Sequence, residues 1–192
     1  EAAQIMSANK NILKPGSGDV VVASKLLDIV LGCYWMTKSV SNMKGEGTAF
    51  PSTNAAITAY DFRAIDLRAK IKVLPSTNKK YAQFKGAIFE TTVGRLLFNS
   101  VLPSDFPYLN EEITNKRMGA LVQDLVTAYK LDGIPAILDK IKTFGFRYAT
   151  HAGITWSISD VVVPDIKKEL VAKGQASAVR EQENYRDGLL TE

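Results

Sequence analysis

The sequence predicts an α+β fold of mixed helices and short antiparallel strands, ending in a long exposed helix that is half of a coiled coil. Apolar residues recur every three or four positions in 114–130 and 134–141, as they do on one face of a helix. In 66–73 they alternate with basic residues, as in a strand with one solvated side. The stretch 165–186 is charged, with a thin apolar stripe that is typical of an exposed helix.

Composition is that of a soluble globular protein, with 192 residues, 46% of them hydrophobic and 23% charged. No apolar run approaches the roughly 20 residues that span a bilayer, and residues 1–6 lack the basic start of a signal peptide. We therefore expect a cytoplasmic protein with no membrane partner. Because residues 1–13 read as the tail of a helix, we also expect the chain to be part of something longer.

Cys33 is the only cysteine and His151 the only histidine, so a disulfide or a Cys/His zinc site within one chain is excluded. Carboxylates are scattered singly or in adjacent pairs, and no Asp-x-Asp cradle for two-metal chemistry is present. We predict no catalytic residue, no metal ligand and no cofactor in this chain. The net charge of +4 permits an anionic partner without requiring one.

The first 60 residues alternate turns with apolar segments. The segment 26–36 is apolar nearly all round, which predicts a helix that is buried on most sides. Lys44-Gly45-Glu46-Gly47 lacks the spacing and the following lysine of a phosphate-binding loop, so we interpret it as a plain turn. The other expected elements are a turn at 15–19, a strand at 20–22, a cap at Ser24, and a helix at 51–60 capped by Thr53 or Asn54.

The middle of the chain predicts two strands. In 66–73, Leu67, Ala69, Ile71 and Val73 fall on one face, opposite the basic residues. A turn-rich segment follows at 75–80, then a β-branched and aromatic strand at 87–93 that ends at Gly94. Pro103 and Pro107 bracket a loop.

The last third predicts three helical segments around a turn. The helix 114–130 should bury Met118, Leu121, Val122, Leu125 and Val126. The next helix begins near Pro135, which suits a first turn. Gly153 can end it with a positive φ, and 154–159 alternate as a half-buried strand would. A charged helix then runs from Asp165 to Arg186, with Gly188 as its breaker.

One concentration of basic residues is a candidate binding surface. It contains Arg68, Lys70 and Lys72, with Arg63, Lys79, Lys80 and Lys85 nearby. These cations could track phosphates in an independent nucleic-acid-binding module. We favour a solvated strand face, because no aromatic residues interleave with the charges for stacking. His151 could act as a general base, but the sequence fixes no partner beside it, which favours a turn histidine bonded to backbone.

Several segments, in order and at compatible spacing, resemble the largest (β′) subunit of bacterial DNA-directed RNA polymerase just after its catalytic loop. The resemblance extends over nearly the whole chain, and its strength is the collinearity. The matching runs are Met6-Ser7-Ala8-Asn9, Asn11-Ile12-Leu13, 30–37, 44–47, Leu67-Arg68-Ala69-Lys70-Ile71-Lys72-Val73, 91–95, Leu102-Pro103, 145–150, Gly153-Ile154, 160–164 and Gly188-Leu189-Leu190-Thr191. Departures are the inserted Lys10, the residues 24–27, and His151 where the family usually has arginine.

The resemblance implies a part of the secondary channel, through which nucleotides enter and backtracked RNA leaves. It implies three segments: 1–110 as the end of the active-site domain with the stranded part of the pore, 111–163 as the helical pore part, and 164–192 as the start of the funnel. The family's catalytic Mg²⁺ is held by aspartates that lie before the matched region. The chain would therefore work only inside the polymerase, in the nucleoid, and would be no enzyme alone. A non-catalytic scaffold domain is the remaining alternative.

The resemblance also implies partners and site residues. The partners are the β, α and ω subunits, template DNA, RNA, and the cleavage or regulatory factors of the secondary channel. The channel-lining or nucleic-acid-contacting residues are Arg68, Lys70, Lys72, Arg95, Arg147, Thr150 and His151. The factor-binding rim helix, first arm of an antiparallel coiled coil, carries Lys167, Lys168, Arg180, Tyr185 and Arg186.

Some relatives bind a guanosine alarmone at the start of the helix before 144–164, using a lysine and a tyrosine. The corresponding positions here hold Asp132 and Thr143. A carboxylate repels phosphates instead of pairing with them. The sequence therefore predicts no alarmone site on this surface.

Overall fold

The computed structural model describes residues 5–8, 10–14, 16–18, 27–129 and 133–189. The chain divides into two compact units, 1–154 and 155–192, which we describe separately. Helices dominate, with one small sheet, so the predicted α+β class is confirmed. Among the described helices, none has the length and hydropathy to cross a membrane.

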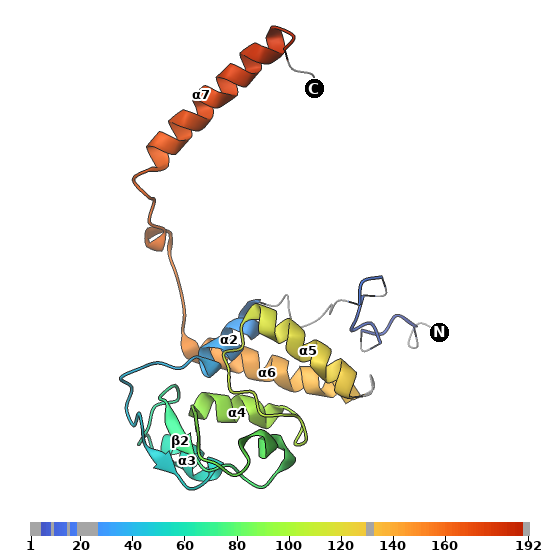
Figure 1. The fold of residues 1–192 in the computed structure, drawn as a ribbon, viewed down its shortest axis with the longest axis vertical. Coiled ribbons are helices and arrows are strands. Elements are labelled where there is room, and N and C mark those ends of the chain that lie inside the picture. The colour runs from blue at the N-terminus through green and yellow to red at the C-terminus, as the bar shows by residue number, and fades with distance from the viewer. Residues whose placement is uncertain (1–4, 9, 15, 19–26, 130–132, 190–192) are drawn as a thin grey trace. The chain divides into compact units, whose positions relative to one another are not determined.

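Helices build the larger part of the first unit. They are α2 (Leu27–Thr37), α3 (Thr53–Asp61), α4 (Val93–Val101), α5 (Asn115–Ala128) and α6 (Ile134–Ala152), with a 3-10 helix, η1 (Lys79–Phe84). Helix α2 packs chiefly against α6, and α4 contacts α2, α3 and α6 (Figure 1). Two glycines set the closeness of α2 and α6: a Cβ on Gly32 would lie 1.9 Å from the Gly145 carbonyl oxygen. The two helices therefore meet backbone to backbone.

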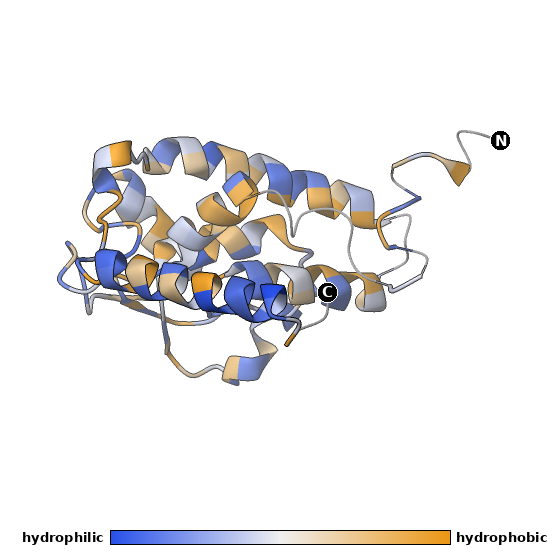
Figure 2. Ribbon diagram, turned by 90° about the horizontal axis from the view of Figure 1, so that it is seen from above, coloured by the Kyte–Doolittle hydropathy of each residue, from blue (hydrophilic) through white to orange (hydrophobic). Residues whose placement is uncertain are grey.

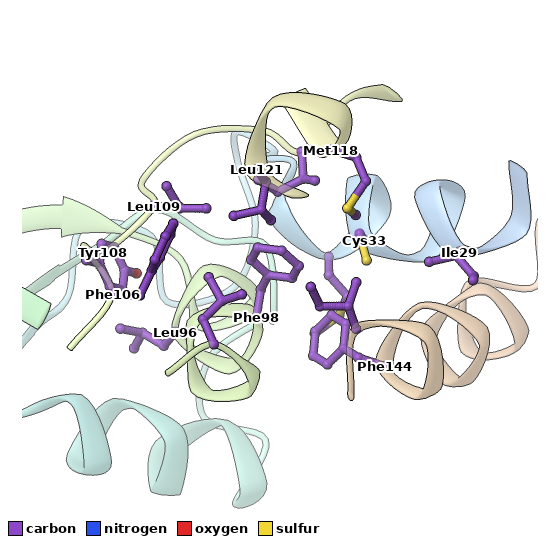
Figure 3. Packing of buried hydrophobic residues seen from close by; sticks show 14 of the residues in the cluster. Ile29, Cys33, Leu96, Phe98, Phe106, Tyr108, Leu109, Met118, Leu121 and Phe144 are labelled. Carbon is purple, nitrogen blue, oxygen red and sulfur yellow. The ribbon is translucent and has the colours of Figure 1, made fainter. Parts of the chain in front are cut away.

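The core lies where α2, α4, α5 and α6 converge. Figure 3 shows Phe98 of α4 between residues of the other helices, among them Leu121 and Phe144. The Phe98 and Phe144 rings meet edge to face, with centroids 5.7 Å apart. Cys33 and Met118 are fully buried nearby. This packing confirms the prediction that α2 is a largely buried helix.

The sheet has three short strands in the order β1–β2–β3. They are β1 (Ala49–Phe50), β2 (Ile71–Val73) and β3 (Phe89–Thr91); β1 runs parallel to β2, and β2 antiparallel to β3. The expectation of purely antiparallel strands is therefore wrong for the first pair.

The strand predicted over 66–73 is confirmed only at 71–73. The Arg68 N–H donates to Asp66 Oδ1 at 2.9 Å, and the Ala69 N–H donates to the Asp66 carbonyl, which closes a turn. Apolar residues are nevertheless buried at alternate positions from Ile65 to Val73. The apolar alternation therefore predicted burial correctly over 66–73, but it predicted the strand conformation correctly only at 71–73.

The strand predicted over 87–93 is also too long, because Thr92 caps a helix. Its Oγ1 accepts a hydrogen bond from the Arg95 N–H at 3.2 Å, so α4 begins at Val93, a helix that the sequence did not predict. Gly94 permits close packing: a Cβ there would lie 1.9 Å from the Met36 carbonyl oxygen.

Of the helix tail expected over 1–13, Ile5 is helical, whereas the described residues 6–8 and 10–13 are not. The Asn11 side chain donates to the carbonyls of Ile5 and Ser7, a local bond that competes with helix formation. The turn before α2 is confirmed at 16–18, where Gly18 has a φ of +69°. The predicted strand 20–22, the cap Ser24 and Asp132 lie outside the described residues.

Several further predictions in the first unit hold with small shifts. Helix α3 is confirmed, but its cap is Ser52, whose Oγ accepts from the Ala55 N–H. The turn at 44–47 and the loop between Pro103 and Pro107 are confirmed. Helix α5 starts after its cap Thr114 and buries the predicted residues, with Val126 only partly buried. Helix α6 ends, as predicted, at Gly153 with a φ of +59°.

The second unit consists of a 3-10 turn, η3 (Ile158–Asp160), and the long helix α7 (Lys167–Arg186). The strand predicted over 154–159 is wrong: Ser157 and Asp160 form a capping box, and Ile158 is 90% exposed. Helix α7 is confirmed, and the helix that ends near the C label in Figure 2 is mostly hydrophilic. Its pairing in a coiled coil stays a prediction, as does the subdivision into 1–110, 111–163 and 164–192.

Candidate functional site

A polar network ties α2 and α4 to the segment before α5. Arg95 Nε donates to the Thr37 carbonyl at 2.8 Å, and its Nη1 donates to the Asn110 carbonyl at 3.1 Å. Thr37 Oγ1 in turn accepts from the Ile113 N–H at 2.9 Å. Burial lowers the pKa of Arg95, and the nearby Tyr108 and acidic residues oppose that shift. Arg95 thus uses its donors within the fold.

A second buried cation, Lys80, bonds to the C-terminal end of α4. Lys80 Nζ donates to the carbonyls of Asn99 and Leu102 at the end of that helix. Burial lowers its pKa, and Asp105 opposes the shift. Lys80, counted in the basic concentration from sequence, is therefore an internal contact and not part of a solvated basic face.

The candidate site is a cavity of about 480 Å³ in the first unit, which we call the basic pocket. It lies among the end of α2, the turn at 44–47, the end of α3, the segment 63–68 and the end of α6. Its lining residues are Trp35, Lys44, Tyr60, Arg63, Ile65, Asp66, Leu67, Arg68 and His151.

Trp35 organises one wall of the basic pocket. The Arg68 guanidinium carbon lies 4.7 Å from the Trp35 ring centroid, a cation–π contact. The His151 ring meets Trp35 edge to face at 5.7 Å. The structure therefore brings together two of the residues named from sequence, Arg68 and His151, through an aromatic residue that was not named.

The lining of the basic pocket includes two further cations, Lys44 and Arg63. Lys44 Nζ donates to the Arg63 carbonyl at 2.8 Å, which fixes the ammonium at the pocket. Gly45, with a φ of +81°, packs its backbone on Ile65, where a Cβ would lie 2.3 Å from Cγ2. The turn we interpreted as plain is thus the element that positions Lys44.

Electrostatics in the basic pocket favour an anion. Lys44, Arg63 and Arg68 stand against one carboxylate, Asp66, and Asp66 Oδ1 already accepts from the Arg68 N–H. The pKa of Tyr60 is raised, chiefly by burial and then by Tyr148 and two nearby aspartates. The tyrosine is therefore a neutral hydroxyl at the pH of the cell.

The other residues named from sequence lie elsewhere. Lys70 directly precedes β2 and Lys72 lies within it, and neither residue lines the basic pocket. Arg147 stacks on Tyr148 at 5.8 Å and lines a separate cavity, and Thr150 Oγ1 donates to the Phe146 carbonyl within α6. Their roles in nucleic-acid or channel contacts stay predictions.

The residues named for factor binding all lie on α7. Lys167 and Lys168 line a shallow cavity with Val171 and Gln175, and Arg180 pairs with Glu181 at 2.9 Å. Tyr185 is half exposed and Arg186 is in the last turn. The helix thus offers cations and a few apolar side chains, and factor binding stays a prediction.

Sequence reasoning missed Trp35, Lys44 and Tyr60 as site residues, whereas Arg63 was named only as a neighbour of the basic strand. Trp35 and Tyr60 read as helix packing, because they lie within α2 and α3. No aromatic residue interleaves with the cations in the sequence, but the fold brings Trp35 from α2 and Tyr60 from α3 into the same pocket. The usable signal was the pair Trp35 and Arg68 inside two of the resemblance motifs.

Comparison with known families matches residues 11–161 to RNA polymerase Rpb1, domain 3. Over its whole length the chain is similar to curated proteins named DNA-directed RNA polymerase subunit beta′. It is 38% identical to those of Saccharopolyspora erythraea, Sulfurihydrogenibium sp. and Thermobifida fusca. The chain covers 15%, 12% and 16% of these relatives, respectively.

The matched region contains α2 to α6 and the whole basic pocket. It spans most of the chain, and the relatives extend the similarity to all of it. The chain therefore belongs to the family of RNA polymerase Rpb1, domain 3, in the form found in bacterial β′ subunits.

Proposed function

We propose that this chain acts in DNA-templated transcription as a segment of a β′ subunit that lines the secondary channel. The observation that carries the proposal is the similarity of all 192 residues to proteins named DNA-directed RNA polymerase subunit beta′, of which they cover 12–16%. Its partners would be the β, α and ω subunits, template DNA and RNA. The segment would shape the route by which nucleotides enter and backtracked RNA leaves.

The chemistry of nucleotide transfer would belong to another part of the enzyme. Among the residues that the structure describes, no three His, Cys, Asp or Glu side chains gather as a metal site requires. These residues therefore do not fit the Mg²⁺ that serves phosphoryl chemistry in polymerases. The role of this segment would be to position and to guide.

Two features suit that role. The basic pocket presents Arg68 and His151 beside Trp35, a cationic and aromatic surface that phosphates and bases can contact. Helix α7 is exposed and charged along its length, as a docking element for channel factors would be.

A chimeric polymerase tests the proposal. The homologous segment of a bacterial β′ subunit is replaced by residues 1–192, and the purified chimera is assayed for subunit assembly and template-dependent RNA synthesis. We expect assembly with β, α and ω and measurable synthesis. A matched chimera with Gly32→Val, which disrupts the contact between α2 and α6, should fail to assemble.

Two results would contradict the proposal. One is a chimera that does not assemble although the inserted segment resists proteolysis as a folded unit. The other is a chimera whose RNA synthesis and cleavage of backtracked RNA are both unchanged when Arg68 and His151 are replaced together by alanine.

A further inference from the structure

We propose that the basic pocket binds a nucleoside phosphate, with the phosphates on Lys44, Arg63 and Arg68 and the base against the aromatic wall. The inference concerns binding by the chain itself. It rests on the same pocket that the proposed function uses, but it is measured without the polymerase, so the two proposals can fail separately.

The cations of the basic pocket have donors to spare. Among the described residues, the Arg63 and Arg68 guanidinium groups have no hydrogen-bonded or ion-paired partner. The described contacts of Lys44 use one of its three N–H groups. Asp66 is partly engaged by the backbone N–H of Arg68. A bound anion would therefore gain charge-assisted hydrogen bonds without breaking an existing ion pair.

The aromatic side of the pocket selects for a ring. Trp35 holds the planar Arg68 guanidinium against its face, which leaves the edges of the guanidinium for two parallel bonds to a phosphate. Tyr60 and His151 add two more rings at the same cavity. Bases stack on such side chains with little preference among sequences.

The size of the pocket exceeds that of a simple anion. Its volume of about 480 Å³ lies within the range of roughly 300–1,000 Å³ that is common for sites of small organic ligands. Inorganic phosphate would make no ring contact with Tyr60 or His151. A mononucleotide carries both the charge and the ring that the lining matches.

The test uses the full chain and one of its own fluorophores. The sequence has two tryptophans, Trp35 and Trp156, so the variant Trp156→Phe leaves Trp35 as the only reporter. This variant is titrated at low salt with ADP, inorganic phosphate, adenosine and a short oligoribonucleotide. We expect saturable quenching by ADP, with weaker binding of phosphate and of adenosine.

Matched variants connect the signal to the pocket. Arg68→Gln and Lys44→Gln should each weaken ADP binding roughly tenfold, the effect of losing one charge-assisted bond. Lys116→Gln removes the same charge from an exposed position on α5 outside the lining of the pocket and should leave affinity unchanged within about twofold, as expected for a screened charge. Unfolding in urea, measured on each sample, verifies that each variant is folded. Arg63→Gln repeats the test at the third cation that lines the pocket.

Four outcomes would overturn the inference. They are absence of saturable quenching by ADP, equal weakening by Lys116→Gln and Arg68→Gln, equal affinity for phosphate and ADP, and tighter binding of the oligoribonucleotide with a steep salt dependence. The last would instead favour an independent nucleic-acid-binding module.

Discussion

Helices α6 and α7 have nearly the same length, but only α6 has a core to pack against. Helix α6 spans 19 residues and buries Ile134, Leu138, Ile141 and Phe144 against the first unit. Helix α7 spans 20 residues and buries none. Most helical stability in proteins comes from packing an apolar face and not from propensity. The comparison therefore predicts that the two helices respond differently to equal changes.

The largest expected effect is at the contact between α2 and α6. In Gly32→Ala, the new Cβ would meet the Gly145 carbonyl oxygen at 1.9 Å, so two backbones must separate. We expect a loss of about 3 kcal/mol in the free energy of unfolding, the upper range of overpacking. Urea unfolding followed by circular dichroism measures it. Gly133→Ala is the control, since a Cβ there meets nothing within 4 Å; equal stability of the two variants would show the packing account wrong.

The next effect concerns the buried side chain of Asn99. Its Oδ1 accepts from the Leu109 N–H and its Nδ2 donates to the Leu109 carbonyl, both at 2.8 Å. In Asn99→Ala both backbone groups lose their partner while buried, which should cost roughly 2–3 kcal/mol. Ser100→Ala, at an exposed neighbour, should change stability by less than about 0.5 kcal/mol. A shift below 1 kcal/mol for Asn99→Ala, about the minimum cost of a buried unpaired group, would mean that water replaces the lost bonds.

A smaller effect depends on pH. Burial raises the pKa of the Cys33 thiol from 9.0 to about 12. The thiol loses its proton more readily in the unfolded chain, so the free energy of unfolding falls as pH rises from 9 towards 12. Below pH 9 the stability that this thiol contributes is fully present. At pH 10 the loss should be about 1.4 kcal/mol relative to pH 7. Cys33→Ala should remove this difference of about 1.4 kcal/mol between pH 7 and pH 10, however much the substitution itself lowers the free energy of unfolding. An unchanged difference would contradict the burial of a neutral thiol.

The smallest effect is expected in α7. A Cβ at Gly174 meets nothing within 4 Å, so Gly174→Ala should favour the helix by about 1 kcal/mol through propensity alone. The helical signal of the chain should rise, while the urea midpoint of the first unit stays constant. A midpoint shift comparable to that of Gly32→Ala would indicate that α7 shares the core's cooperativity.

The periodic elements could be predicted from the sequence, and the reason is physical. Helices α5 and α6 present one apolar face to a core, so their apolar residues repeat every three or four positions, whereas α2 is buried on most sides and is apolar nearly all round. Helix α7 was recognised by its charge and by the breaker at Gly188. Gly153 marked the end of α6 because a left-handed φ there favours glycine.

Three of the errors share one physical cause, which is hydrogen bonding of side chains to the backbone. Asp66 turns the chain where alternation suggested a strand, Thr92 starts α4 where β-branched residues suggested a strand, and Ser157 with Asp160 closes a turn. Each of these residue types competes with ladder hydrogen bonds. The bonded backbone groups lie only two or three residues away, and the apolar periodicity of the sequence does not show that these bonds form.

The candidate site could be predicted only in part. Arg68 and His151 were named, but Trp35 and Tyr60 reach the same cavity from helices that read as ordinary packing. Arg95 was named for contacts outside the chain, whereas its guanidinium donates to Thr37 and Asn110. Tertiary proximity decides such assignments, and no local pattern encodes it.

Amide hydrogen exchange on the full chain tests the central comparison most directly. It reports local stability segment by segment. We predict strong protection of 121–126 in α5, close to that for global unfolding of the first unit, and weak protection of 179–185 in α7 in dilute solution. Equal protection of the two segments would contradict the account, because α7 would then have a stabilising partner that the packing of the described residues does not supply.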